Sequence, residues 1–120
     1  MEIIFLEKTP DGSHFMIDCG EGSQIQCMKS TVKPGRISKI FITHLHGDHC
    51  YGLSGFLSTM SQHDKKSQTE NEIKRVVEIY GPVGLRAMLR ISLSLSQSQL
   101  GFDFVVHELI PDSWQKKVNI

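Results

Sequence analysis

The sequence lacks the marks of several protein classes, and each absence narrows what the chain can be. Only three of its 120 residues are cysteines, and no two of them stand at C-x-x-C spacing. A disulfide framework is therefore not expected, and a reducing compartment is the simplest setting. No apolar run approaches the length that crosses a bilayer, and the first six residues carry no basic segment of a signal peptide. We expect no membrane partner and a cytoplasmic location, with the nucleus left open.

Net charge is absent too. Thirteen Lys and Arg residues balance thirteen Asp and Glu residues, so the formal net charge is zero. A basic surplus is the usual sign of a nucleic-acid-binding domain. A nucleic-acid partner must therefore be argued from a site and not from overall charge. No Pro, Gly or Ser-rich linker divides the chain, so residues 1–120 are interpreted as one domain or a piece of one.

Hydrophobic periodicity predicts strands that alternate with helices. The strands are expected at residues 2–6, 14–19, 37–43, 76–80 and 102–109. The helices are expected at residues 23–29, 53–60 and 84–96. Ser23 is expected to cap the short helix, with Ile25 and Met28 on one face. Residues 62–74 read as a polar surface loop and residues 111–120 as a polar end. The alternation predicts an α/β fold with helices packed on a sheet.

A group of metal-binding side chains follows the strand expected at residues 37–43. His44, His46, Asp48 and His49 lie within six residues. Hydrolytic zinc sites use neutral imidazoles and carboxylates, and they leave one position open for water. His44 and His46 can face one metal, while Asp48 and His49, after a turn at Gly47, can face a second. Two such metals can hold the attacking and leaving oxygens of a phosphodiester. The alternative is a loop of surface histidines that binds no metal.

Several segments carry a family resemblance. The run IFITHLHGDHCYGLSGFL at residues 40–57 resembles the metallo-β-lactamase superfamily. The runs IDCGEGSQIQCMKS, EIYGPVGLR and FVVHELIP narrow the resemblance to the tRNase Z family, in its short form. That resemblance implies an α/β fold in which this chain is the N-terminal part of a four-layer αββα sandwich. It also implies a zinc-dependent endonuclease that removes the 3′ trailer from precursor tRNA, works as a homodimer and holds two zinc ions.

The resemblance also implies roles for individual residues. His44 and His46 would hold the first zinc, and Asp48 and His49 the second. Asp48 would in addition accept a proton from the attacking water. Asp18 would lie beside the site and orient a ligand imidazole without binding the metal itself. The alternative for Asp18 is a turn aspartate that bonds its local backbone.

The chain departs from the family pattern at both ends. The family completes its site with a histidine, a bridging aspartate and a last histidine, all of which would lie beyond Ile120, and its glycine turn near the start is missing here. We therefore interpret residues 1–120 as the N-terminal half of a domain, inactive or nearly so by itself. Its inner sheet face is expected to be an exposed apolar patch. His14, His63 and His107 are not expected to replace the missing ligands.

Three alternatives remain open from the sequence. Cys50, next to His49, is within reach of a metal, although a small buried hydrophobic residue is the simpler interpretation. The chain is either a partial enzyme or a non-catalytic fragment that binds zinc or a partner. A metallo-β-lactamase-fold hydrolase of another substrate, such as a thioesterase of the glyoxalase II type, shares the H-x-H-x-D-H spacing.

Overall fold

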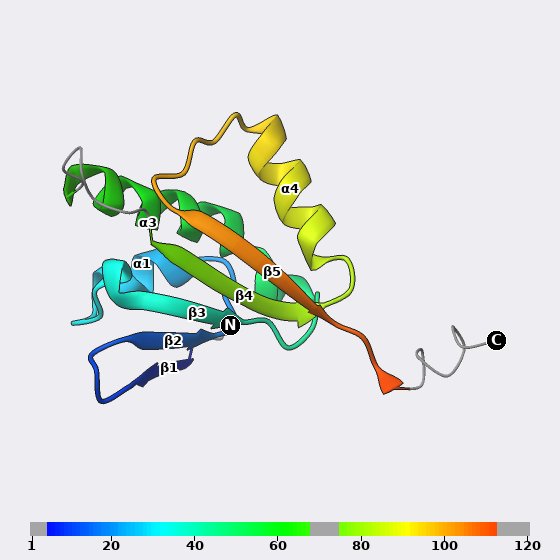
Figure 1. Ribbon diagram of the computed structural model, residues 1–120, viewed down its shortest axis with the longest axis horizontal. Helices are drawn as coiled ribbons and strands as arrows, with labels where there is room; N and C mark the ends of the chain where they lie inside the picture. Colours follow the sequence, from blue (N-terminus) through cyan, green and yellow to red (C-terminus); the bar gives the residue numbers. More distant parts are fainter. Residues whose placement is uncertain (1–4, 68–74, 113–120) are drawn as a thin grey trace.

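The structure is a computed structural model that describes residues 5–67 and 75–112, and it defines side-chain surroundings for residues 8–62 and 75–112. The described part alternates strands and helices, which confirms the expected α/β fold (Figure 1). The strands are β1 (Phe5–Lys8), β2 (His14–Ile17), β3 (Ile37–Phe41), β4 (Val76–Pro82) and β5 (Asp103–Leu109). The helices are α1 (Ser23–Met28), α2 (Gly47–Cys50), α3 (Leu53–Ser67) and α4 (Leu85–Leu95), with a short 3-10 turn, η1 (Pro34–Arg36), before β3.

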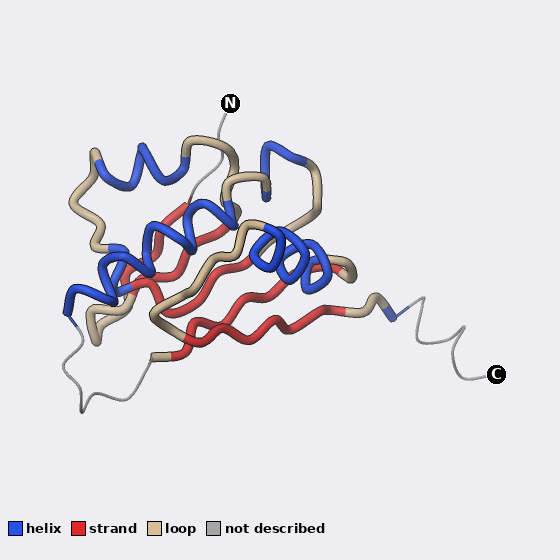
Figure 2. The backbone as a smooth tube through the Cα atoms, turned by 90° about the horizontal axis from the view of Figure 1, so that it is seen from above, coloured by secondary structure: helices blue, strands red, loops and turns tan. Residues whose placement is uncertain are grey.

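The strands form one sheet in the order β1-β2-β3-β4-β5. β1 and β2 form an antiparallel hairpin, and β2 to β5 run parallel to one another. Each parallel crossover leads to the next strand in the same direction. Because such crossovers share one hand, their helices collect on one face of the sheet. Figure 2 shows the helices on that side and the strands on the other. The carboxyl ends of β2 to β5 consequently lie along one edge.

The core lies between the sheet and its helices. Met16, Ile40, Ile79 and Val106 are neighbours in register across β2 to β5, and all four are buried. The helices cover this row with buried side chains from α3 (Leu53, Phe56, Leu57 and Met60) and from α4 (Leu85, Leu89 and Leu93). Full burial of one such side chain contributes about 1.5–3 kcal/mol to folding. Packing between layers therefore holds the sheet edge that carries the site.

The opposite face of the sheet has no helix over it within the described residues. It is not the purely apolar patch expected from the sequence. Phe41 stacks on Tyr80 with ring centroids 5.0 Å apart, and Tyr80 stacks on His107 at 4.5 Å. In the adjacent row, the ammonium of Lys39 lies 3.5 Å from the carboxylate of Glu78. Side chains alternate between the two faces along each strand, so the apolar core residues point toward the helices. The aromatic ladder and the ion pair lie on the open face.

Two sequence-based expectations about the helices are wrong. Ser23 does not cap α1: it is the first helical residue and is fully buried, while Gly22, in the left-handed region, precedes it. Ile25 and Met28 share a face, but that face is exposed, because Ser23 and Cys27 are the buried side chains of α1. The segment 62–74 is not a loop throughout: α3 continues to Ser67, and residues 68–74 lie outside the described part. Gln62, Lys65 and Lys66 have high helix propensity, and this favours extension of the helix beyond its apolar stripe.

The strand boundaries agree with expectation to within a few residues. β2 ends at Ile17 and not at residue 19, because Asp18 adopts a left-handed backbone conformation with φ 62°. β3 ends at Phe41, two residues before the expected end, and β4 continues to Pro82. Residues 1–4 and 113–120, where part of the first strand and most of the polar end were expected, lie outside the described residues. None of the described helices is both long and apolar enough to cross a membrane.

Candidate metal centre

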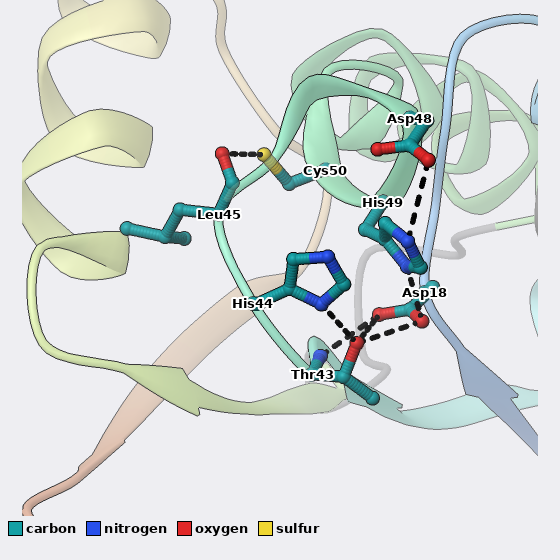
Figure 3. A network of polar contacts seen from close by, with 7 residues as sticks. All are labelled: Asp18, Thr43, His44, Leu45, Asp48, His49 and Cys50. Atoms are coloured by element: carbon teal, nitrogen blue, oxygen red, sulfur yellow. Dashed lines mark hydrogen bonds and ion pairs between the residues drawn. The ribbon is translucent and has the colours of Figure 1, made fainter.

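The carboxyl-end edge of the sheet gathers the predicted site residues. Asp18 immediately follows β2, and the segment from Thr43 to His49 follows β3. Asp18 has a positive φ, a conformation that Asp tolerates better than most residues and that often marks functional sites. The left-handed turn redirects the chain, and its carboxylate lies against the loop after β3 (Figure 3).

Asp18 is the hub of a hydrogen-bond network. Its side chain is buried, and Oδ1 accepts the backbone N–H of Thr43 at 2.8 Å. The Thr43 hydroxyl donates to the same carboxylate, 2.9 Å from Oδ2. Nδ1 of His49 lies 2.8 Å from Oδ2. The hydrogen-bond partners of Asp18 are thus 25 and 31 positions away in the sequence. The alternative interpretation, in which Asp18 bonds the backbone of its own turn, does not describe these contacts.

The network sets the tautomers of two histidines. A carboxylate only accepts, so the His49 nitrogen that faces Asp18 carries the proton. The Thr43 hydroxyl donates its hydrogen bond to Asp18, so its oxygen accepts from Nδ1 of His44 at 3.0 Å. In both histidines Nδ1 is the donor, and Nε2 keeps its lone pair. Neutral imidazole held in this way by an outer partner is the usual form of a metal ligand.

Three potential ligands converge in front of this network. The ligand atoms of His44, His46 and Asp48 all lie within 4.8 Å of one another. Nε2 of His49 lies 3.4 Å from Oδ2 of Asp48, and the rings of His44 and His49 are 3.8 Å apart at their centroids. Asp48 is therefore next to both the His44–His46 pair and His49. His46 and Asp48 are exposed, so the cluster opens to solvent.

The donor set fits zinc. Zinc in proteins binds imidazole nitrogen and carboxylate oxygen, which are the atoms gathered here. It usually has four ligand atoms in a tetrahedral arrangement. The hard cations magnesium and calcium prefer oxygen ligands throughout. His44, His46 and Asp48, with His49 beside them, would hold the ion.

Backbone contacts fix the loop that carries the histidines. The N–H of Cys19 donates to the carbonyl of His49 at 2.8 Å, and the N–H of Gly52 donates to the carbonyl of Cys19 at 3.0 Å. The two segments approach so closely that a Cβ at Gly52 would collide with the carbonyl oxygen of Gly20. Only glycine permits this approach. The loop after β2 is thereby held to the start of α3 beneath the ligand cluster.

The cysteines beside the site are structural. Cys50 is buried, and its thiol donates to the carbonyl of Leu45 at 3.4 Å. Burial raises the pKa of the Cys50 thiol, and burial raises that of Cys19 to about 12. Both thiols therefore stay protonated near neutral pH in the metal-free chain. These observations favour the interpretation of Cys50 as a small buried hydrophobic residue.

The other histidines lie elsewhere. His107 is on the open sheet face, stacked on Tyr80. His14 begins β2, at the opposite edge of the sheet from the ligand cluster. The side chain of His63 lies outside the described residues. The sequence predicted no role for Thr43, the last residue of the strand expected at 37–43. It also predicted none for Gly52, which shows only as a glycine after a turn of helix.

Comparisons with known proteins agree with this geometry. Residues 3–82 match the family model described as anti-Pycsar protein Apyc1. Zinc phosphodiesterase ELAC protein 1 from Bos taurus is 51% identical over 105 residues, which cover 88% of this chain and 28% of that protein. Ribonuclease Z from Streptococcus gordonii is 47% identical over 102 residues, covering 85% of this chain and 31% of that protein. The chain thus spans less than a third of the length of these relatives.

Solved structures give the same result for the fold. Human tRNase Z, short form, superposes with a TM-score of 0.80 and 45% identity, covering 95% of this chain and 41% of the other. The metallo-β-lactamase fold protein YhfI from Bacillus subtilis superposes with a TM-score of 0.61 at 17% identity, covering 92% of this chain and 40% of the other. At 17% identity, the match with YhfI supports a shared fold and nothing further. The chain therefore has the metallo-β-lactamase fold of these structures over the part that it spans.

Proposed function

We propose that this chain, which belongs to the family described as anti-Pycsar protein Apyc1 and is homologous to the amino-terminal part of tRNase Z, supplies the histidine-rich part of a zinc phosphodiesterase centre. The proposed reaction is removal of the 3′ trailer from precursor tRNA. The observation that carries the proposal is the convergence of His44, His46 and Asp48, with ligand atoms within 4.8 Å of one another.

Each residue of the site has a separate part in the proposal. His44 and His46 would hold the first zinc, His44 through the Nε2 atom that its contact with Thr43 leaves free, and His49 would hold a second zinc. Asp48 lies within reach of both, 3.4 Å from His49 at its nearest oxygen. Bound zinc would supply Lewis-acid chemistry, which polarises a phosphoryl oxygen and lowers the pKa of water. Asp48 is half exposed, with 54% of its side-chain surface accessible, and accepts the proton released in the reaction.

Asp18 and Thr43 act on the ligands rather than on the substrate. Asp18 holds the ring of His49 directly and the ring of His44 through the Thr43 hydroxyl. One buried carboxylate would therefore orient one histidine ligand of each of the two zinc ions. Such outer partners increase ligand basicity and reduce the reorganisation needed for binding.

The partners proposed are precursor tRNA and a second copy of the chain's parent protein. The apolar stripe of α3 does not serve that dimer, because Leu53, Phe56, Leu57 and Met60 are covered by the chain's own sheet. Another surface must therefore make the contact. Three buried free cysteines fit a reducing compartment, so the proposed setting is the cytoplasm or the nucleus.

The 120-residue chain by itself is proposed to bind zinc without cleaving RNA. The four ligand residues at His44, His46, Asp48 and His49 serve two ions between them, fewer than a closed zinc shell requires for each. A chain tested alone should therefore leave precursor tRNA intact in the presence of zinc.

A segment exchange tests the proposed function. Residues 17–110 would replace the matching segment of human tRNase Z, short form, and the purified chimera would be incubated with zinc and a precursor tRNA that carries a 3′ trailer. We expect cleavage at the trailer, and no cleavage when the chimera carries Asp48→Asn. A folded, zinc-loaded chimera that leaves the precursor intact but hydrolyses a glutathione thioester would favour the glyoxalase II-type alternative and end the proposal.

A further inference from the structure

A basic pocket lies at the sheet edge opposite the metal centre. It has a volume of about 540 Å³ and is enclosed by the turn between β1 and β2 and by the segment that leads into β3. Its polar lining residues are Lys8, Asp11, His14, Thr31, Lys33 and Arg36. Because β2 and β3 point away from this pocket toward the ligand cluster, the two sites are separated by about 15 Å, the length of a five-residue strand.

The pocket concentrates positive charge in a chain whose net charge is zero. Lys8, Lys33 and Arg36 contribute three cations, against the single carboxylate of Asp11. None of the three cations forms an ion pair within residues 8–62 and 75–112. Cations that face one concave space without partners repel one another, and an anion bound among them relieves that repulsion.

The one acidic group of the pocket is already engaged. The carboxylate of Asp11 accepts the hydroxyl of Thr9 and the backbone N–H of Ser13, the latter at 3.0 Å. These hydrogen bonds lower the pKa of Asp11. Asp11 therefore closes its own turn, and it does not neutralise Lys8, Lys33 or Arg36 through an ion pair.

Backbone geometry brings the three cations together. Lys33 and Arg36 are three residues apart across the 3-10 turn η1, where the N–H of Arg36 donates to the carbonyl of Lys33 at 2.9 Å. Residues at this spacing lie on the same side of a 3-10 turn. Lys8 is the cross-strand neighbour of His14 in the β1–β2 hairpin. Two elements thus direct basic side chains into one space.

The side chain of Arg36 also lies beside the turn. A Cβ built on Gly12 would lie 2.7 Å from Nη1 of Arg36, so the guanidinium lies directly on the Gly12 backbone. The turn beneath it is closed by hydrogen bonds from Thr9 N–H to the Ser13 carbonyl, 2.8 Å, and from Gly12 N–H to the Thr9 carbonyl, 3.0 Å. The planar guanidinium of Arg36 is suited to paired hydrogen bonds with two oxygens of one anion.

We propose that this pocket binds a phosphate group. A phosphate offers several charged oxygens to the Arg36 guanidinium, the two ammonium groups and the Thr31 hydroxyl, whereas a single carboxylate offers two. The phosphate belongs either to a free phosphomonoester or to the backbone of an RNA strand. The site is distinct from the metal centre, and it does not depend on the proposed nuclease function.

Titration followed by NMR tests this proposal on the 120-residue chain. The chain would be labelled with nitrogen-15 and kept with a chelator, so that no metal binds phosphate at the histidine cluster. Sodium phosphate and a ten-residue oligouridylate with hydroxyl ends would be added in separate experiments at constant ionic strength. We expect saturable shifts of the backbone amides of Gly12, Thr31 and Lys33 with at least one of these ligands.

Variants separate a specific site from general charge. Arg36→Gln should weaken binding about five- to tenfold, as expected for loss of a charge-assisted hydrogen bond. Lys33→Gln, on an exposed side chain, gives the same test without touching the turn between β1 and β2. Arg90→Gln removes one exposed cation from α4 and should leave the affinity unchanged.

The pattern of binding identifies the source of the phosphate. Binding of oligouridylate at lower concentration than phosphate assigns the pocket to an RNA backbone, and binding of phosphate alone assigns it to a free phosphomonoester. The proposal is overturned if neither ligand gives saturable shifts, or if Arg36→Gln and Lys33→Gln bind as tightly as Arg90→Gln. Because the metal is absent throughout, none of these outcomes bears on the nuclease function.

Discussion

Oδ2 of Asp18 lies 2.8 Å from Nδ1 of His49, a contact that joins the loop after β2 to the loop after β3. It explains why the two loops converge. The buried carboxylate needs donors, and the histidine needs a fixed tautomer, so each residue satisfies the other. The Thr43 backbone and hydroxyl occupy the remaining positions around the carboxylate.

Replacing Asp18 by Asn should weaken zinc binding. The amide cannot accept from His49, Thr43 N–H and Thr43 hydroxyl with the strength of a carboxylate, so the ligand rings lose their orientation. We expect affinity to fall about 10- to 100-fold, the usual effect of losing an outer partner of a metal ligand. Competition with a chromophoric chelator measures the change. Asp103→Asn, which removes an exposed carboxylate from the far end of β5, is the matched control, and an equal loss there would count against the role of Asp18.

The Thr43 hydroxyl can be tested separately. Thr43→Val keeps the shape and the backbone N–H but removes the oxygen that links His44 to Asp18. Zinc affinity should fall about three- to tenfold, since one hydrogen bond to a charged group is lost. Thr43→Ser restores the hydroxyl and should restore the affinity. If the Val and Ser variants bind zinc equally, the proton chain through Thr43 has no effect on the site.

Gly52 and Gly55 make a contrasting pair for stability. A Cβ at Gly52 collides with the carbonyl oxygen of Gly20, so Gly52→Ala should lower the free energy of unfolding by about 2–3 kcal/mol. The nearest atom to a Cβ at Gly55, Oε1 of Gln24 in α1, is 3.6 Å away, which is an ordinary contact. Gly55→Ala should therefore raise stability by about 0.5–1 kcal/mol. Urea denaturation of the two variants would refute this reading of the loop contact if both changed stability in the same direction.

We expect the raised pKa of the Cys19 thiol to lower the free energy of unfolding in alkali. Burial raises its pKa from 9.0 to about 12, so between these values the unfolded chain releases the proton while the folded chain keeps it. The folded state then binds more protons, and stability falls as pH rises through this window, by up to about 1.4 kcal/mol per pH unit. Below pH 9 this contribution to stability is fully present. Cys19→Ala should show a shallower fall than the wild-type chain in urea denaturation between pH 9 and pH 11, and parallel curves would contradict the assignment.

Much of the fold follows from the sequence because its signals are local. The stripe at Leu53, Phe56, Leu57 and Met60 predicts a helix, and those side chains are the ones that pack on the sheet. Ser23 shows the limit of such reasoning. A serine before a helix is a good cap by its chemistry, but packing of α1 against α3 buries it one position into the helix. Whether Ser23 caps the helix or lies inside it depends on long-range contacts, which the local sequence does not show.

The candidate site shows the same division. The spacing of His44, His46, Asp48 and His49 was visible because adjacent ligands in one loop need no fold to be brought together. The contact of Asp18 with Thr43 and His49 spans 25 and 31 residues and depends on the parallel pairing of β2 with β3. Thr43 could not be singled out from the sequence, since threonine is also a common last residue of a strand.

The most direct test of the metal centre is a zinc titration of the 120-residue chain and two histidine variants. His46→Ala removes one of the three ligands whose atoms converge, and His14→Ala removes a histidine at the opposite edge of the sheet. The account predicts zinc binding by the wild-type chain and by His14→Ala with equal affinity, and affinity lowered about tenfold or more in His46→Ala. Zinc binding by His46→Ala as tight as that of the wild-type chain would contradict it.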